Sequence, residues 1–108
     1  MMEQRDLLLV PFPFSNQKGR KVRPAAVISN DEFNRHSEDV LVAGITLNIS
    51  NASNLTNKDL EEGNLPAECD IKCKNILKID KDMIIKKIGR IKKEKLEMIK
   101  NIILEIIK

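Results

Sequence analysis

The spacing of the apolar residues changes near Lys92, and this change constrains the fold more than any other feature of the sequence. Before it, apolar residues come in short runs bounded by polar, glycine- or proline-bearing segments, which is typical of strands and turns. After it, they recur every three or four residues, which predicts one amphipathic helix. The sequence therefore predicts a mainly β (α+β) chain, a small curled sheet or open barrel with a C-terminal helix.

The short apolar runs predict six strands. Pro11 and Pro13 cannot donate to a ladder, so the residues around them are expected at a sheet edge or outside the sheet. The run 40–47 is apolar nearly throughout and is expected to be buried on both faces. Asp80 is a candidate cap for a helical turn, and Gly89 indicates a bend or a close approach. The predicted strands cover residues 6–10, 24–29, 40–47, 68–74, 76–79 and 83–91.

Three polar segments separate these strands. Residues 15–21 are basic and contain a glycine, and residues 30–39 form a polar connection that has room for a helical turn. Residues 48–66 are long, polar and without periodicity. A loop of that length in a compact domain is usually functional or mobile.

A chain of 108 residues and 12.3 kDa predicts one domain covering residues 1–108. Such a small domain has a thin core, so we expect it to gain stability as a homodimer. The aromatic residues are three phenylalanines, with no tryptophan or tyrosine. A surface of stacked aromatic side chains, as in many single-strand RNA binders, is therefore excluded as the main binding device.

Charge is distributed unevenly along the chain. Residues 1–29 carry five basic and two acidic side chains, residues 30–70 carry two and nine, and residues 71–108 carry twelve and five. Basic ends around an acidic middle suit a partner that bears phosphates. A solvated lysine-rich surface is the competing interpretation.

Two cysteines, Cys69 and Cys73, lie four residues apart. On a strand they would share a face about 13 Å apart, at about 3.3 Å per residue, which is too far for a disulfide. His36 is the single histidine, and no carboxylate cluster completes a metal site, so we predict reduced thiols and neither metal nor cofactor. The N-terminus lacks a signal-peptide pattern and no run is long enough to span a bilayer, so a cytoplasmic protein without membrane contact is expected.

Arg23 is the first candidate for chemistry. Pro24 restricts the backbone of Arg23 to extended geometry, so the pair aims the guanidinium with little freedom. A guanidinium is planar, permanently charged and able to hold two phosphate oxygens at once. An ordinary surface salt bridge is the competing interpretation.

Thr46 is the second candidate, because it ends an otherwise apolar strand. Its hydroxyl has a simpler use as a hydrogen-bond partner of the backbone. If strands 24–29 and 40–47 pair, however, Arg23 and Thr46 converge at one end of the sheet. That end would then place a cation beside a hydroxyl.

Four segments together resemble the MazF/PemK-like toxins of toxin–antitoxin pairs: "DLLLVPFPF", "KVRPAAVISND", "VLVAGIT" and "IDKDMIIKKIGRI". The resemblance runs from Asp6 to the last helix. It implies an SH3-like small barrel of the MazF/CcdB type with a C-terminal helix, usually a homodimer. It also implies a toxin that is a metal-independent, sequence-specific endoribonuclease for single-stranded RNA, and a cognate antitoxin protein as partner.

The resemblance assigns the catalytic arginine to Arg23 and the catalytic threonine to Thr46. It implies that the ribose 2′-hydroxyl attacks the adjacent phosphate, which leaves 2′,3′-cyclic phosphate and 5′-hydroxyl ends. RNA contacts are expected from the two loops that flank this site: Phe14 by stacking, Lys18, Arg20 and Lys21 at phosphates, and Asn48 and Asn51 at base edges. For Phe14, a place in the core is the competing interpretation, because short apolar runs are usually buried.

Two points are less simple. The family commonly has a Gly-Asp step near its start, and Arg5 stands at the glycine position here. If that position needs an unusual φ or a close approach of the substrate, Arg5 alters the site; if it does not, Arg5 adds a charge near the RNA. The general base is also unassigned, because an arginine stays protonated at neutral pH. His36 has suitable chemistry, but a solvated loop residue is the simpler interpretation of it.

Two other functions fit the same pattern. A related group of toxins shares the barrel and the dimer but inhibits DNA gyrase without cutting RNA. A catalytically inactive, basic RNA-binding barrel is the third hypothesis.

Overall fold

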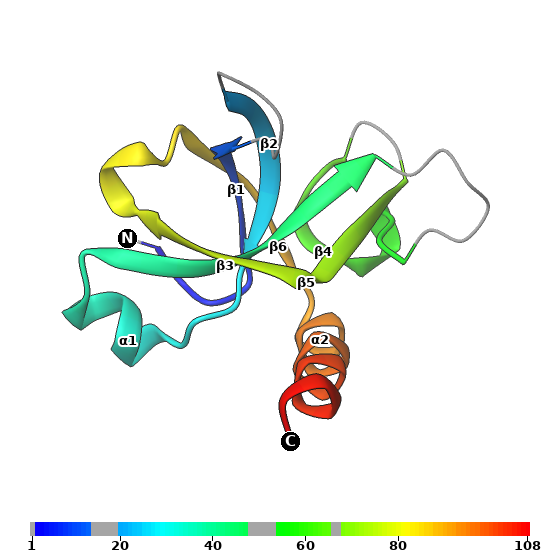
Figure 1. Ribbon diagram of the computed structural model, residues 1–108. Helices are drawn as coiled ribbons and strands as arrows, with labels where there is room; N and C mark the ends of the chain where they lie inside the picture. Colours follow the sequence, from blue (N-terminus) through cyan, green and yellow to red (C-terminus); the bar gives the residue numbers. More distant parts are fainter. Residues whose placement is uncertain (1, 14–19, 48–53, 66–67) are drawn as a thin grey trace.

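The protein forms one curled antiparallel sheet followed by a long helix (Figure 1). The computed structural model describes residues 2–13, 20–47, 54–65 and 68–108. Within these residues the sheet has six strands in the order β4-β6-β1-β2-β3-β5. The strands are β1 (Asp6–Pro13), β2 (Arg20–Val27), β3 (Asp39–Leu47), β4 (Leu60–Gly63), β5 (Cys69–Asp80) and β6 (Lys86–Ile91). The helices are α1 (Asp31–His36), α2 (Lys93–Ile107) and two 3-10 turns, η1 (Asn57–Asp59) and η2 (Lys81–Met83).

The segment before β4 draws the two outer strands of the sheet together. Leu55 forms an isolated bridge with Cys69 of β5, with an N–O distance of 2.9 Å in each direction. A few residues later, β4 pairs with β6 at the other edge. One short stretch of chain thus links both edges, and the sheet is a partly open barrel. The predicted mainly β fold with a C-terminal helix is confirmed.

Strand β1 continues through both prolines, where the prediction ended the strand at residue 10. Its pairing with β6 stops at Leu9, whereas its pairing with β2 extends to Pro13 opposite Arg20. Pro11 and Pro13 therefore lie where β1 is an edge strand, which is the position that a missing N–H allows.

Three other strand predictions need correction. Strand β2 begins at Arg20, four residues before the predicted start, because it pairs with the proline-containing half of β1. The two strands predicted at 68–74 and 76–79 are one strand, β5, whose ladder with β3 shifts register between Ala43 and Gly44. Strand β4 was not predicted, and the last strand begins at Lys86.

The buried side chains form two clusters, which alternate along the strands as a sheet requires. One cluster includes Ala26, Ala43 and Ile45 and is covered by Leu96 and Ile99 of α2. The other lies on the opposite face of the central strands and consists of Leu8, Val10, Ala25, Val27, Val40, Val42 and Ile79. Strand β3 is therefore buried on both faces, as predicted.

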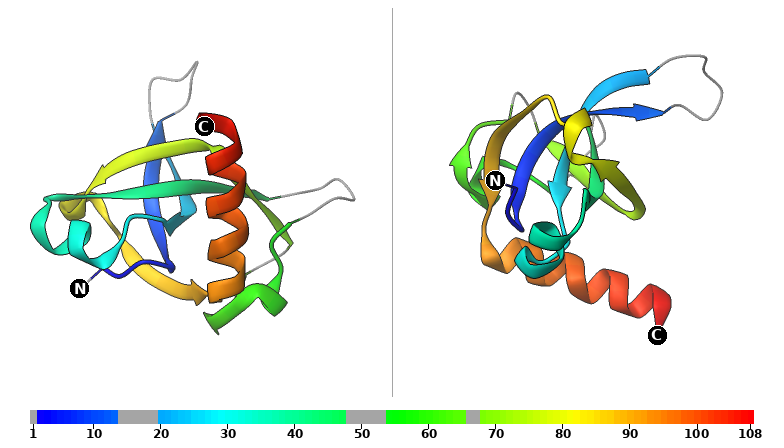
Figure 2. Two further views of the ribbon diagram at one scale, coloured as in Figure 1. Left: turned by 90° about the horizontal axis from the view of Figure 1, so that it is seen from below. Right: turned by 90° about the vertical axis from the view of Figure 1, so that its left-hand side faces the viewer.

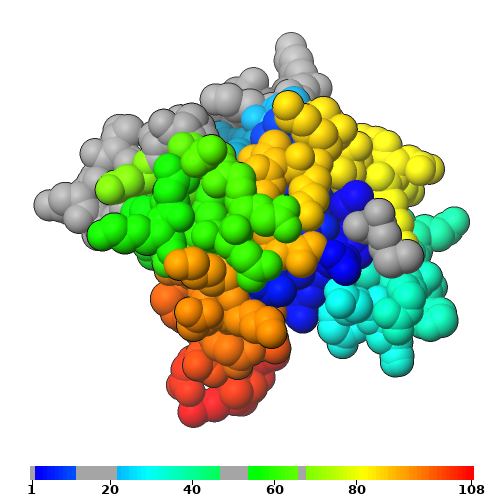
Figure 3. Space-filling model, turned by 180° about the vertical axis from the view of Figure 1, so that it is seen from behind, coloured from blue at the N-terminus to red at the C-terminus, as the bar shows by residue number. Residues whose placement is uncertain are grey.

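Helix α2 covers one face of the sheet with its first half, and its second half extends away from the body (Figures 2 and 3). Leu96 and Ile99 are buried, whereas Ile106 and Ile107 are 53% and 72% exposed. The helix begins after Lys92 without a side-chain cap, because a lysine side chain has no oxygen that could accept from the first backbone N–H groups. The predicted cap is present in η2, where the Asp80 side chain accepts from the N–H of Asp82 at 2.8 Å.

Candidate functional site

Arg23 lies in β2, directly opposite Val10 of β1. The neighbouring Pro24 is paired with Leu9, so the Arg-Pro step is part of the regular ladder. Arg23 is half-buried, and Ala25 two residues later is fully buried. Side chains two apart share a face of a strand, so Arg23 extends from the end of the cluster that contains Val10 and Ala25.

Thr46 lies in β3, and β2 and β3 do pair. Their recorded pairing runs from Val27 opposite Val42 to Ala25 opposite Gly44. Continued by two residues, the same register places Thr46 opposite Arg23. Both are half-buried, and both are on the face that α2 does not cover. The sheet therefore brings the two predicted catalytic residues to one end of one face.

His36 is at the other end of these strands. It is the last residue of α1, which joins the end of β2 to the start of β3, whereas Arg23 and Thr46 lie toward the start of β2 and the end of β3 (Figure 1). Val27 and Arg23 are four residue steps apart, which is about 13 Å at about 3.3 Å per residue. An acid–base role for His36 at this site does not fit the topology.

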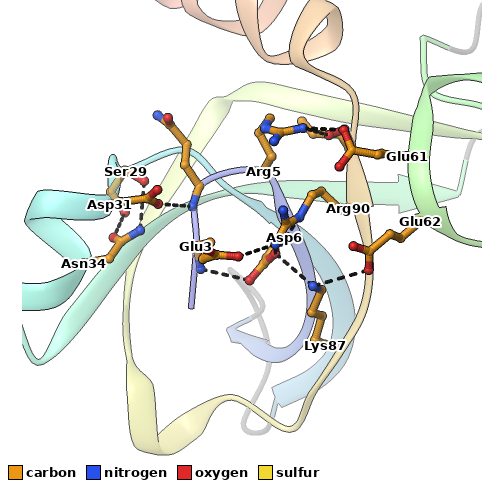
Figure 4. A network of polar contacts seen from close by, with 12 residues as sticks. Glu3, Arg5, Asp6, Ser29, Asp31, Asn34, Glu61, Glu62, Lys87 and Arg90 are labelled. Carbon is orange, nitrogen blue, oxygen red and sulfur yellow. Dashed lines mark hydrogen bonds and ion pairs between the residues drawn. The ribbon is translucent and has the colours of Figure 1, made fainter. Parts of the chain in front are cut away.

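Arg5 adopts φ of +82°, in the left-handed region that favours glycine. The residue is nevertheless well anchored, because its N–H donates to the Val27 carbonyl at 2.9 Å and its carbonyl accepts from Ile91 N–H at 2.9 Å. The guanidinium donates to the Ile91 carbonyl and to Glu61, whose pKa it holds below the usual value (Figure 4). Arg5 thus meets the demand for an unusual φ and has its charge engaged away from Arg23.

The next residue, Asp6, is the centre of a buried polar network (Figure 4). Its side chain is 1% exposed and lies 3.1 Å from the Arg90 guanidinium and 3.4 Å from the Lys87 ammonium. It also accepts from the N–H of Glu3 at 2.9 Å. Arg90 forms a hydrogen bond with Glu3, and this bond raises the pKa of Arg90. The network joins the N-terminus to β6 and is structural.

The predicted RNA contacts fall mostly outside the described residues. Phe14, Lys18, Asn48 and Asn51 are not among them. Arg20 and Lys21 are, and their backbone begins β2, paired with Pro13 and Phe12. The two loops that contain these residues adjoin the start of β2 and the end of β3, which is the end of the sheet where Arg23 and Thr46 lie.

One residue at this end was missed by the sequence analysis. Asp70 of β5 is the ladder partner of Thr46. Directly opposite residues present their side chains on the same face, with Cβ atoms about 5 Å apart. The sequence shows a carboxylate in the predicted strand 68–74, but only the register of β3 with β5 places it beside Thr46.

Cys69 and Cys73 are free, as predicted, and both are buried on β5. Burial raises the pKa of each thiol. Among the residues that the structure describes, no three His, Cys, Asp or Glu side chains gather as a metal site would require. None of the described helices has the length and apolar composition that a membrane crossing needs.

Comparison with known proteins identifies the family. A sequence model of the PemK-like, MazF-like toxins of type II toxin–antitoxin systems matches residues 3–107. The chain belongs to this toxin family. Membership confirms the resemblance that the four sequence segments, among them "KVRPAAVISND" and "VLVAGIT", indicated.

Relatives of this toxin agree in sequence and in fold. The endoribonuclease MazF of Staphylococcus saprophyticus is 31% identical over 108 residues, which cover 95% of this chain and 88% of that protein. The Mycobacterium tuberculosis toxin MazF-mt6 superposes with a TM-score of 0.71 at 18% identity, covering 94% of each chain. An endoribonuclease in complex with its cognate antitoxin, from a mycobacterial species, gives a TM-score of 0.67 at 15% identity, covering 97% of this chain and 96% of that one.

Proposed function

We propose that this toxin is an endoribonuclease that cleaves single-stranded RNA at specific sequences, without a metal ion, and uses Arg23 and Thr46. The observation that supports the proposal is the register of β2 with β3: continued by two residues, it sets Arg23 opposite Thr46, both half-buried, at one end of one sheet face. The family and the endoribonuclease relative support the same activity.

The reaction uses a nucleophile that RNA itself supplies. The ribose 2′-hydroxyl attacks the adjacent phosphorus, the bond from phosphorus to the 5′-oxygen breaks, and the products are a 2′,3′-cyclic phosphate and a 5′-hydroxyl end. Charge grows on the non-bridging oxygens as phosphorus becomes five-coordinate. Arg23 stabilises that charge by bidentate contact, and Thr46 donates a hydrogen bond to the same group.

The test uses purified protein, a mixed RNA pool and an excess of chelator. We expect cleavage to cyclic-phosphate ends at recurring short sequences. Arg23→Ala should lower kcat by about 10² to 10³, because it removes a donor to the transition-state oxygens. The kcat of Arg23→Lys should lie between those of the unaltered protein and Arg23→Ala, since lysine keeps the charge and lacks the planar guanidinium. Arg35→Ala, on the exposed face of α1, is the matched control and should cleave like the unaltered protein.

Other outcomes would favour the other two hypotheses. Intact RNA together with inhibition of DNA gyrase would indicate a gyrase-directed toxin. Retarded but uncut RNA would indicate an RNA-binding barrel without catalysis. Cleavage that survives Arg23→Ala would remove Arg23 from the site.

The partners follow from the family and the surface. We propose a cognate antitoxin that covers the site, and a cytoplasmic location where mRNA is accessible. We also propose a homodimer, supported by the exposed apolar residues in the second half of α2, which include Leu104, Ile106 and Ile107. Light scattering at micromolar concentration should give about twice 12.3 kDa, and a monomer mass would reject the dimer.

A further inference from the structure

The proposed reaction lacks a group that can take a proton. A 2′-hydroxyl must lose its proton as it attacks, and arginine and threonine are both poor bases at neutral pH. His36 is at the other end of the strands. A base must lie within hydrogen-bond reach of the hydroxyl, so it should come from a strand adjoining Arg23 or Thr46.

Asp70 has the required position. It pairs with Thr46 in the ladder of β3 with β5, and the extended register of β2 with β3 places Arg23 on the far side of Thr46. The three residues form one row across three adjacent strands. Cys69 and Ile71, the neighbours of Asp70 in β5, belong to the buried cluster under α2. Because side chains alternate between the two faces along a strand, Asp70 points to the opposite face. The carboxylate therefore shares the face of Arg23 and Thr46.

Among the described residues, one oxygen of the Asp70 carboxylate is held closely and the other loosely. One oxygen, Oδ1, accepts from the N–H of Asn54 at 3.1 Å. The other, Oδ2, is 3.8 Å from the Lys72 ammonium, a distance that leaves the ion pair loose. The side chain of Asp70 is 19% exposed. A carboxylate can accept several hydrogen bonds, so Oδ2 retains capacity for a hydroxyl proton.

Three charged residues lie near Asp70 in the sheet. Lys72 is on the same face of β5, Glu68 comes directly before β5, and Arg23 lies two strands away in β2. Glu68 is exposed and lies beyond the end of the ladder of β3 with β5, which stops at Cys69. Asp70 is thus the carboxylate placed beside Thr46 among the described residues.

Resting on the function proposed above, we infer that Asp70 is the general base of the cleavage step. The 2′-hydroxyl proton passes to Oδ2 as the 2′-oxygen bonds to phosphorus. The bond from phosphorus to the 5′-oxygen then breaks, and that oxygen takes a proton from solvent. Asp70 returns its proton to solvent, so the cycle consumes no proton overall. Arg23 and Thr46 hold the phosphate while Asp70 acts on the sugar.

Asp70→Asn tests this with little change in shape, since the amide oxygen can still accept from the Asn54 N–H. We expect kcat to fall by about 10² to 10⁴, the usual contribution of general base catalysis, with KM changed little. The unaltered enzyme should slow as the pH falls, because protonation removes the base. In Asp70→Asn this acidic limb of the pH–rate profile should disappear. Asp70→Glu should restore part of the activity together with the limb.

Two matched controls separate chemistry from structure. Asn54→Ala removes the side-chain bonds from Asn54 to the Ile71 N–H (2.8 Å) and carbonyl (3.4 Å), so it loosens the same junction but keeps the carboxylate. Glu68→Gln removes the neighbouring negative charge. Both variants should keep the acidic limb. Circular dichroism and urea unfolding of each variant show whether the fold is retained.

The results distinguish this inference from the proposed function. Arg23-dependent cleavage that is unchanged in Asp70→Asn would overturn the inference and leave the function standing. The inference would also be overturned if Asp70→Asn and Asn54→Ala lowered kcat equally and both variants kept the acidic limb of the pH–rate profile. If the unaltered protein cleaves no RNA, both fail together.

Discussion

At the scale of a single residue, Arg5 shows how a side chain can stabilise a backbone that it does not suit. A positive φ costs a non-glycine residue about 1 to 2 kcal/mol, because Cβ approaches its own carbonyl oxygen. Arg5 adopts φ +82° despite this cost, and the hydrogen bonds of its guanidinium with Glu61 and the Ile91 carbonyl help to offset it. The side chain is 15% exposed, so those contacts are partly shielded from water.

The first prediction compares two substitutions of this residue. Arg5→Ala and Arg5→Gly lose the same side-chain bonds, but glycine alone is relieved of the strained φ. We expect Arg5→Gly to be about 1 kcal/mol more stable than Arg5→Ala, the reverse of their order in ordinary strand positions. Urea unfolding of both variants measures the difference. Equal stabilities, or a more stable alanine variant, would show that the φ of Arg5 is unstrained.

The residues of the proposed site differ in how far the sequence motifs indicate them. Arg23 and Thr46 could be selected because proline fixes the backbone beside one and an apolar strand precedes the other. Asp70 could not, because its partner in the ladder depends on the register of two strands that are distant in sequence. That register shifts within β5, so counting residues along the chain would not have found it.

At the scale of the elements, β4 and β6 approach each other closely where two glycines lie opposite, Gly63 and Gly89. A Cβ at Gly63 would lie 2.2 Å from the Ile88 carbonyl oxygen, and one at Gly89 would lie 2.5 Å from the Glu62 carbonyl oxygen. Gly63 also has a φ of +84°. The predicted close approach at Gly89 is confirmed, and it exists because β4 packs against it.

The second prediction follows from that contact. Gly63→Ala should lower the free energy of unfolding by about 3 kcal/mol, since it adds a strained φ to a clash with backbone that cannot move aside. Asn64→Ala, at the next and exposed position, is the control and should change the stability by less than about 0.5 kcal/mol. Urea unfolding gives both values. A Gly63→Ala protein as stable as the control would mean that β4 is not held tightly to β6.

Strand β4 also shows why some elements escaped prediction. It has four residues, and Leu60 is the one that is buried. No alternation marks it in the sequence, and its place in the sheet comes from pairing with β6 and from the bridge between Leu55 and Cys69. The two halves of β5 looked like separate strands for a related reason, since the register shift interrupts the alternation of buried and exposed residues.

At the scale of the whole molecule, the core contains two thiols whose ionisation is coupled to unfolding. Burial raises the pKa of Cys69 and of Cys73, so the folded protein holds these protons more tightly than the unfolded chain does. Their stabilising contribution is complete below the thiol pKa of the unfolded chain, about 8.5. It is lost as the pH rises through the folded values.

The third prediction is a pH-dependent difference in stability. We compare the unaltered protein with the double variant Cys69→Ala and Cys73→Ala by urea unfolding at pH 7 and pH 10. From pH 7 to pH 10 the free energy of unfolding should fall more for the unaltered protein than for the variant, because the variant has no thiols to titrate. Both thiols should react slowly with a disulfide reagent until the protein unfolds. Equal losses of stability in the two proteins would contradict the raised pKa values.

The sequence by itself determined the fold class, the C-terminal helix, the reduced state of the cysteines and the family. These depend on local patterns: apolar spacing, proline and glycine positions, and short motifs that fix the backbone. The tertiary structure alone decided the bridge between the sheet edges, the close contact of Gly63 with Gly89, and the row of Arg23, Thr46 and Asp70. Each of those requires a register between distant segments, and register is set by how whole faces of strands pack together.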